Sequence, residues 1–378
     1  MAANFKVGGV DTDELFIPKS AVWQPGERNT LWSWGYNVNG QLGDGTTITR
    51  SSPVQIGTLI EWDKISSGKI HAVSRKADGT LWCWGNNQHN QLGDGTVIHR
   101  SSPVQLGSLT EWAGVACGGY HSLARKTNGT LWGWGRNNFG QLGDGTQINK
   151  SSPVQVGILS SWSVISGGSL HSMACMTDGT LWTWGYNTNG QIGDGTISTR
   201  LNPTQIGNLS TWVDVAGGEA HSLARKSDGT LWSWGLNNFG QLGHGTITHR
   251  SSPVQVGSLT NWANIAGGDW HSIARKTDGT LWCWGRNYAG CLGDGTQINK
   301  SSPVQIGSLT NWADVAGGVY HSLARKTDGT LWTWGYNSLG ALGDGTSTVK
   351  SSPVQVGTLL TWESVSSGSY GSYAIQSI

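Results

Sequence analysis

The sequence predicts an all-β fold: a β-propeller of seven blades, each a sheet of four antiparallel strands. Three observations predict it. The motif LWxWG begins at Leu31 and returns every 50 residues as far as Leu331, without insertion or deletion. Each repeat holds four short strand-like runs separated by turn residues, and no stretch has the 3.6-residue apolar period of a helix. The first repeat begins part-way through the unit and the last one stops part-way through it. Such small sheets bury both faces only against neighbouring sheets, which predicts a closed ring.

The four strands can be assigned within one copy. HSLARK (221–226) and GTLWSWG (229–235) are strands B and C, because an Asp-Gly pair between extended runs is a strong hairpin signal. SSPVQVG (251–257) is strand D, at a sheet edge because Pro253 cannot donate a backbone hydrogen bond. TNWANIAGG (260–268) is strand A of the next blade.

The chain ends predict how the ring closes. Complete blades span 62–106, 112–156, 162–206, 212–256, 262–306 and 312–356. The remaining blade is split, with strands C and D from 30–56 and strands A and B from 362–378. One shared sheet removes two free strand edges. Residues 30–378 are therefore a single propeller. Residues 1–29 are unlike the repeat, and we expect this N-terminal leader to dock on the propeller or on a larger assembly.

Tryptophan supplies the predicted core. Of the 23 Trp residues, 21 fall into three series with 50-residue spacing. Two series come from LWxWG, where strand alternation places both Trp on one face and Leu on the other. The third begins at Trp62. Since a buried Trp removes roughly 150–250 Å² from water, we expect these rings to pack between blades.

Composition excludes several classes of function. The chain has 24 basic and 23 acidic residues, so we expect no nucleic-acid partner. No apolar run approaches the roughly 20 residues of a membrane span, and the leader lacks a signal peptide, so we expect neither membrane insertion nor secretion. Five Cys without CxxC spacing predict neither a disulfide framework nor a zinc site. The expected location is the cytoplasm, or a virion.

Polar residues recur at fixed positions without forming a recognisable catalytic or cofactor motif. Six His begin strand B, one in each complete blade; they cannot converge on one metal ion, so we expect each to satisfy buried backbone. The Asp of GDGT and the Arg or Lys six residues later are expected to pair locally or face water. The basic pairs before the Asp-Gly hairpins, such as Arg75 and Lys76, are expected to be solvated strand ends. We therefore expect no enzyme, no bound metal and no cofactor.

The repeat also resembles a known family. GGxxHSLARKxDGTLWxWGxNxxGQLGDGT, followed by a Pro-Val strand, is similar to the regulator of chromosome condensation repeat of the bacterial or phage type, over about residues 30–378. The resemblance implies a seven-bladed propeller and a choice of activities: nucleotide exchange on a small GTPase, ultraviolet sensing by tryptophans, or inhibition and scaffolding through protein binding. The fold alone does not choose among them.

Two of these activities fit the sequence poorly. Exchange in the family depends on an extra wedge protruding from one blade, whereas every spacing here is 50 residues. The ultraviolet sensor has a GWRHT-like motif on adjacent blades, and only Asp269-Trp270-His271-Ser272 approaches it. Neighbouring copies have Ala220 and Tyr320 at the Trp position.

Differences between the copies indicate a binding face. Alternate connections of an up-and-down sheet leave on the same side, so the A–B and C–D loops share one face, and the variable positions fall there. Tyr, Trp and Arg, which are enriched in binding hot spots, are common at them; drift of exposed loops would instead favour small polar residues. The candidate residues are Ile70, Tyr120, Leu170, Trp270, Tyr320 and Tyr370 before strand B, Tyr36, Arg136, Tyr186, Arg286 and Tyr336 after LWxWG, and Phe139, Phe239 and Tyr288 further along the C–D loop.

We therefore predict a non-enzymatic binding or assembly scaffold whose partner is a protein. The alternative is a phage virion structural or adhesin protein that recognises a host surface or a glycan, since aromatic side chains stack on sugars. It is suggested by the leader sequence FKVGGVDTDELFIPK, which resembles the starts of marine phage virion proteins.

Overall fold

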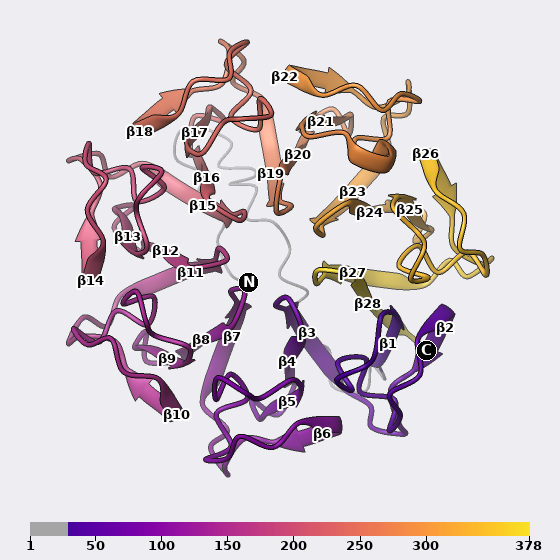
Figure 1. Cartoon of the computed structure of the whole chain (residues 1–378), viewed down its shortest axis with the longest axis horizontal. Coiled ribbons are helices and arrows are strands. Elements are labelled where there is room, and N and C mark those ends of the chain that lie inside the picture. Colours follow the sequence, from indigo (N-terminus) through magenta and orange to yellow (C-terminus); the bar gives the residue numbers. More distant parts are fainter. Residues whose placement is uncertain (1–28) are drawn as a thin grey trace, which may run out of the picture.

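The computed structural model describes residues 29–378. Seven four-stranded antiparallel sheets stand around a central axis like the blades of a propeller, as the sequence predicts (Figure 1). The predicted leader, residues 1–29, lies outside the described residues apart from Asn29.

The strands run from the axis outward in the order A, B, C, D. The A strands are β3 (Trp62–Ser67), β7 (Trp112–Cys117), β11 (Trp162–Gly167), β15 (Trp212–Gly217), β19 (Trp262–Gly267), β23 (Trp312–Gly317) and β27 (Trp362–Ser367). The B strands are β4 (His71–Lys76), β8 (His121–Lys126), β12 (His171–Met176), β16 (His221–Lys226), β20 (His271–Lys276), β24 (His321–Lys326) and β28 (Gly371–Ser377).

The outer half of each blade repeats in the same way. The C strands are β1 (Asn29–Gly35), β5 (Leu81–Gly85), β9 (Leu131–Gly135), β13 (Leu181–Gly185), β17 (Leu231–Gly235), β21 (Leu281–Gly285) and β25 (Leu331–Gly335). The D strands are β2 (Arg50–Gln55), β6 (Arg100–Gln105), β10 (Lys150–Gln155), β14 (Arg200–Gln205), β18 (Arg250–Gln255), β22 (Lys300–Gln305) and β26 (Lys350–Gln355). The D strands lie at the sheet edges, which confirms the position predicted for Pro253.

The split blade closes the ring as predicted. Its strand order is β2-β1-β28-β27, so strands from the two ends of the chain pair in the middle of one sheet. The register of β1 and β28 is continuous from Asn29 opposite Ser377 to Gly35 opposite Gly371. Separating these ends would expose two strand edges and break the circle.

Glycine ends each C strand because the backbone turns sharply there. Gly35 has φ +105°, and a Cβ on it would lie 2.2 Å from the carbonyl oxygen of Tyr370. The pairing of β1 with β2 shifts register between Ser33 and Gly35. The final Gly of LWxWG is thus required by close backbone approach at the start of the C–D loop.

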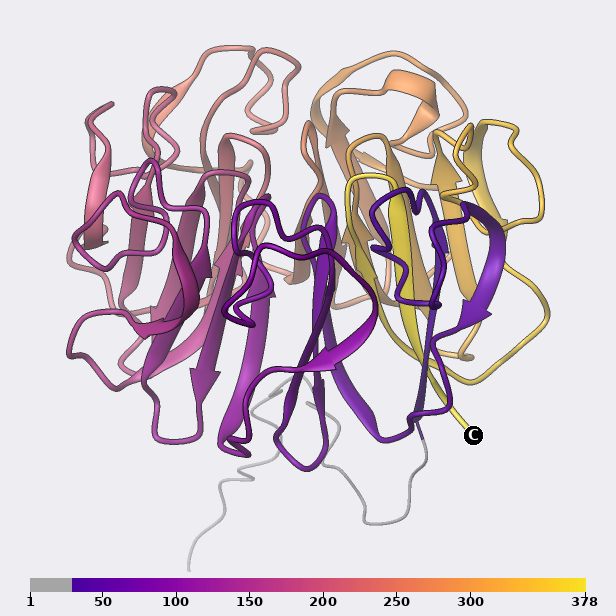
Figure 2. The same cartoon turned by 60° about the horizontal axis from the view of Figure 1, so that its bottom comes forward.

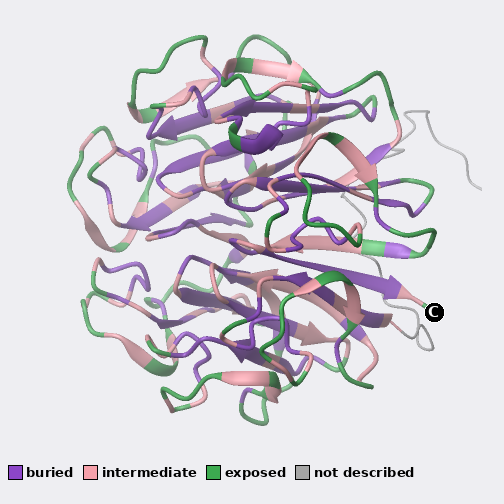
Figure 3. Cartoon of the chain, turned by 45° about the vertical axis from the view of Figure 1, so that its right-hand side comes forward, coloured by how far each residue is buried: buried purple, intermediate pink, exposed green. Residues whose placement is uncertain are grey.

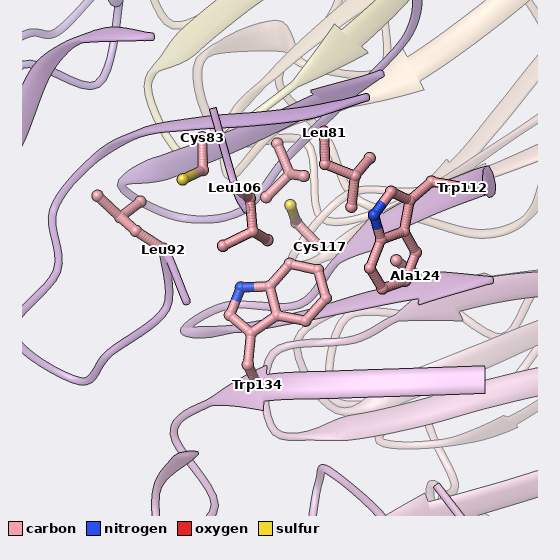
Figure 4. Close-up of a cluster of buried hydrophobic side chains, with 9 residues drawn as sticks. Leu81, Cys83, Leu92, Leu106, Trp112, Cys117, Ala124 and Trp134 are labelled. Carbon is pink, nitrogen blue, oxygen red and sulfur yellow. The ribbon is translucent and has the colours of Figure 1, made fainter. Parts of the chain in front are cut away.

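Tryptophan packs between blades as predicted (Figure 4). Trp134 is fully buried against Leu81 and Cys83 of the preceding blade, and its indole N–H donates to the carbonyl of Gln91 at 3.0 Å. Trp112 lies edge-on to Trp132, with ring centroids 6.2 Å apart. The first Trp of LWxWG is only half-buried, so one of the three rings lines the edge of the core. Buried residues lie mainly along the strands, and exposed residues lie mainly in the peripheral loops (Figure 3).

The prediction that the histidines satisfy buried backbone is wrong. His71 Nε2 lies 2.9 Å from Ser122 Oγ of the next blade, and the same contact repeats in the five other copies that carry His. Ser122 Oγ donates its proton to the carbonyl of Gln91 at 2.8 Å. The imidazole must therefore donate from Nε2, so each His joins two blades through a hydroxyl.

Four of the five lysines before the hairpins are not solvated strand ends, contrary to the prediction. Lys126, Lys226, Lys276 and Lys326 are 6–8% exposed, with the ammonium over two Trp rings of the same blade. For Lys326 the distance to the Trp332 ring centroid is 3.6 Å. Arg75 is also partly buried and pairs with Asp63. Aliphatic stems cover the half-buried Trp ring, which accounts for the difference.

The connections differ at the two ends of the propeller (Figure 2). One end carries the longer C–D loops and the other the short Asp-Gly hairpins. One C–D loop contains η1 (Tyr288–Gly290), a 3-10 turn in which Ala289 has φ +56°. Among residues 29–378, no helix has the length and apolar character needed to cross a membrane.

Candidate functional site

The A–B and C–D loops meet residue by residue at one end of the ring. Tyr36 N donates to the carbonyl of Tyr370 at 3.0 Å, and Arg136 N donates to that of Tyr120 at 3.0 Å. The same bond recurs in every blade and joins the variable position after LWxWG to the variable position before strand B. We call this end the mouth face: the A–B loops, the C–D loops and the first residue of each D strand. The shared face predicted for these loops is confirmed.

A polar network stiffens each C–D loop. Asn37 Oδ1 accepts from Leu42 N at 2.9 Å, and its amide donates to Asp44 at 3.1 Å. Asp44 pairs with Arg50 at 2.8 Å. Burial opposes the charge of Asp44, but hydrogen bonds from Thr46 and Arg50 outweigh it and hold its pKa below the usual value. Equivalent pairs occur in six copies, which confirms the predicted local pairing.

Five tyrosines gather on the mouth face where the ring closes. Tyr288 and Tyr320 have ring centroids 4.8 Å apart, and Tyr336 lies 5.9 Å from Tyr370. Tyr36 meets Tyr370 edge-on at 6.5 Å. This tyrosine cluster combines residues from three consecutive blades, and all five were predicted as candidate residues.

Arg286 links the tyrosine cluster to the next aromatic pair. Its guanidinium lies 4.7 Å from the Phe239 ring centroid and donates to Tyr320 Oη at 3.2 Å. Phe239 meets Trp270 edge-on at 5.8 Å. These contacts form one continuous aromatic arc over half of the mouth.

A second aromatic group lies around Tyr120. The Arg136 guanidinium is 5.6 Å from the Tyr120 ring centroid and 5.8 Å from that of Phe139. Phe139 packs on Tyr186 at 4.7 Å, and His89 meets Tyr120 edge-on at 5.5 Å. Ile70 and Leu170 complete the inner ring as half-buried aliphatic side chains.

Three charged residues meet at the centre of the mouth. Lys69 Nζ lies 2.6 Å from Glu219 and 3.8 Å from Asp269, which belong to blades on the other side of the ring. Burial opposes the charge of Lys69, yet Asp269 and Glu219 raise its pKa. Burial raises the pKa of Asp269 to about 7, opposed by Lys69 and reinforced by Glu219. Beneath them lies a cavity of about 80 Å³ lined largely by glycine.

The sequence reasoning did not single out this central trio or Arg250. Lys69, Glu219 and Asp269 occupy the variable pair before strand B, but their contact joins residues 150 and 200 positions apart. The signal for Arg250 was available, because His244 replaces the Asp that pairs with the basic residue in the other copies. In the part of the chain that the structure describes, no group of three or more His, Cys, Asp or Glu side chains is placed to hold a metal ion.

Comparison with models of known protein families shows the family of this chain. Seven consecutive segments match the model of the Regulator of chromosome condensation (RCC1) repeat, at residues 28–74, 78–125, 128–175, 178–225, 228–275, 278–325 and 328–375. The chain belongs to the regulator of chromosome condensation repeat family. A second model of this repeat matches six segments, from 62–91 to 312–341. The bacterial or phage type of repeat stays a prediction.

Solved structures of similar shape agree with this regulator of chromosome condensation repeat fold. Prp20p from Saccharomyces cerevisiae, described with its binding to Gsp1p and histones, has a TM-score of 0.83 at 22% identity, covering 94% of this chain and 92% of that one. The same yeast protein bound to Kap60 gives 0.83 at 20% identity, covering 100% and 95%. Human WBSCR16 gives 0.81 at 22% identity, covering 93% and 98%. A comparison with curated protein sequences finds no significant match. At these identities the likeness shows the fold alone.

Proposed function

We propose that the protein is a non-enzymatic binding scaffold that holds a protein partner on its mouth face. One observation carries the proposal: the positions at which the repeats differ come together at this end, where they form an aromatic arc and a second aromatic group. The opposite end repeats the same hairpin, with Asp or Asn followed by Gly, in every complete blade. Trp, Tyr and Arg are enriched among the few residues that dominate the binding energy of protein interfaces.

A protein is the favoured class of partner because the solved relative Prp20p is described in complexes or binding studies with proteins: Kap60, Gsp1p and histones. The uniformity of the blades argues against nucleotide exchange as the activity. From residue 29 onward, all C–D connections have the same length, and no blade carries an inserted element. Ultraviolet sensing is disfavoured because Trp270 is the one Trp among the candidate residues of the mouth.

The virion or adhesin alternative stays a prediction. Its main support, the leader sequence, lies outside the described residues, and with it the proposed docking of residues 1–29. Location in the cytoplasm or in a virion also stays a prediction. The tyrosine cluster would suit a glycan as well as a protein, so glycan binding is an outcome that the experiment must separate.

Site-specific photo-cross-linking tests the proposal. A benzophenone amino acid is placed singly at Tyr320, Tyr336 or Tyr370, and as controls at Thr127, Ser227 or Thr277, which are exposed on the hairpin end. We expect one protein to be cross-linked in the host cell from the mouth positions and not from the controls. Cross-links from the hairpin positions alone would contradict the proposal, as would glycan-array binding without any cross-linked protein.

A further inference from the structure

Three arginines of the mouth face have no carboxylate partner. Arg136, Arg250 and Arg286 lie beyond 4.0 Å from every Asp and Glu of residues 29–378, and Nε of both Arg136 and Arg250 is buried without a hydrogen bond. By contrast, the six other basic residues that begin D strands each pair with an Asp of their own loop, at 2.6–3.7 Å.

Two of these arginines occupy the same repeat position and are held by aromatic rings. Arg136 lies against Tyr120 and Phe139. Arg286 lies against Phe239, Tyr288 and Tyr320, at 4.7, 5.5 and 5.0 Å from their ring centroids. Stacking on rings fixes the plane of a guanidinium, so less freedom is lost when a carboxylate binds.

The third arginine has lost its partner by substitution. His244 stands where six copies have Asp, and its Nε2 lies 2.9 Å from Ser233 Oγ and 3.2 Å from the carbonyl of Val254. Burial and the nearby Arg250 lower the pKa of His244 despite the Val254 carbonyl, which favours the neutral imidazole. It offers Arg250 no negative charge.

Every other charged residue of the mouth face has a partner of opposite charge. Each GDGT carboxylate is paired within its loop, and Glu219 and Asp269 share Lys69. The mouth face holds ten basic and eight acidic residues, whereas the rest of residues 29–378 holds eleven of each. The uncompensated charge of the described chain is therefore positive and lies on this face.

We infer that the mouth face recognises an acidic segment of its protein partner, whose Asp or Glu side chains pair with Arg136, Arg250 and Arg286. This inference rests on the proposed function and specifies the chemistry of the partner. Arg and carboxylate form paired, charge-assisted hydrogen bonds, which suit preoriented guanidiniums. A nucleic acid fits less well, because the three arginines belong to three different blades and form no continuous basic stripe.

The full chain is tested by fluorescence anisotropy with three labelled probes: a short Asp- and Glu-rich peptide containing one Tyr, its Asn/Gln counterpart, and single-stranded DNA. We expect the acidic peptide to bind at least about tenfold tighter than either other probe, with an affinity that falls as salt rises. Equal binding of the amide peptide, or tighter binding of DNA, would overturn the inference.

Variants that carry residues found at the same position in other repeats distinguish a loss of peptide binding from a loss of folding. Arg136→Asn with Arg286→Asn introduces the residue found at Asn86, and His244→Asp restores the carboxylate present in six copies. We expect the double variant to weaken acidic-peptide binding about tenfold, and His244→Asp to weaken it a few-fold by engaging Arg250. The control Lys64→Gln with Lys76→Gln removes two charges elsewhere and should leave binding unchanged.

The same variants distinguish this inference from the proposed function. If the mouth positions cross-link to a protein whose binding is unaffected by both arginine-directed changes, the acidic-segment inference is wrong and the protein-binding scaffold stands. If the acidic peptide binds as expected but cross-links come only from the hairpin end, the proposed function is wrong.

Discussion

Tyr373 Oη donates a hydrogen bond of 2.5 Å to the backbone carbonyl of Gln41, within the blade that the two ends of the chain share. At the six other junctions a serine of the following blade donates to the equivalent carbonyl and accepts from a His. At the closing junction Gly371 replaces that His, and Ala72 replaces that Ser. Both members of the pair are therefore absent together, and a tyrosine from the third position of the B strand satisfies the carbonyl instead.

Removing the Tyr373 hydroxyl should weaken closure. Tyr373→Phe leaves the Gln41 carbonyl with the indole N–H of Trp84 as its remaining donor. We expect the free energy of unfolding to fall by about 1–2 kcal/mol, as for other buried hydrogen bonds. Urea unfolding followed by Trp fluorescence measures it, and Tyr36→Phe, on the half-buried mouth, is the matched control.

A compensating variant tests the explanation itself. Combining Gly371→His, Ala72→Ser and Tyr373→Leu rebuilds at the closing junction the arrangement found at the other six. Tyr373→Leu is included because Leu123, Leu223 and Leu323 occupy this position in three of the other copies. We expect the triple variant to be more stable than Tyr373→Phe. If it is less stable, the closing junction does not obey the rule of the others.

Much of the fold could be predicted because each repeat encodes its own sheet. The LWxWG alternation fixed which face of strand C meets the preceding blade, and the unequal chain ends predicted the pairing of β1 with β28. The His–Ser contacts could not be predicted in the same way, because they join residues 51 positions apart in different blades. Which His meets which Ser depends on how adjacent sheets are offset, and no local sequence pattern encodes that offset. The sequence does show that the His and the Ser are both missing at one junction, where Gly371 and Ala72 replace them.

The sequence predicted on which face the candidate site lies, but it did not predict which of the site residues contact one another. The rule that alternate connections share an end placed Tyr36 and Tyr370 on one face. The curvature of the closed ring then decides which loops touch. It brings Lys69 against Glu219 across the axis, and it gathers tyrosines from three blades into one cluster.

The buried histidines should make the propeller sensitive to mild acid. Burial lowers the pKa of His71 and His121 to about 3, and that of His171 and His271 to about 4. Below the ordinary value near 6.5 the unfolded chain binds protons that the folded chain does not, so stability is complete above pH 6.5 and is lost as pH falls toward the folded values. At pH 5 each such His costs about 2 kcal/mol.

Urea midpoints measured from pH 7.5 to pH 4.5 check this expectation. Unfolding should begin to shift near pH 6, above the range in which carboxylates of ordinary pKa titrate. His121→Gln should reduce proton uptake on unfolding at pH 5 by about one proton. A stability that stays flat down to pH 4.5 would show that the histidines are not buried in neutral form.

Two neighbouring glycines should respond in opposite ways to alanine. A Cβ on Gly118 would lie 2.0 Å from the His121 ring, whereas one on Gly114 would meet nothing within 4 Å. Gly118→Ala must displace an imidazole that joins two blades, so we expect it to cost about 2–3 kcal/mol. Gly114→Ala should be neutral or stabilise by about 0.5 kcal/mol, because it restricts the unfolded chain. Thermal unfolding of both variants measures the contrast, and equal melting temperatures would contradict the packing described here.

The lysines over the Trp rings should contribute through packing as well as charge. Lys326 Nζ lies 3.6 Å from the Trp332 ring centroid, while Met176 holds the same position in another blade. Lys326→Met keeps an unbranched apolar chain over the indoles and loses a cation–π contact, so we expect a loss of at most about 1 kcal/mol. Lys326→Glu places a negative charge against the negative faces of two rings and should cost about 2 kcal/mol or more. Chemical denaturation of both, with Met176→Lys as the reverse substitution, separates packing from charge. If Lys326→Met and Lys326→Glu are equally destabilising, the ammonium does not lie over the rings.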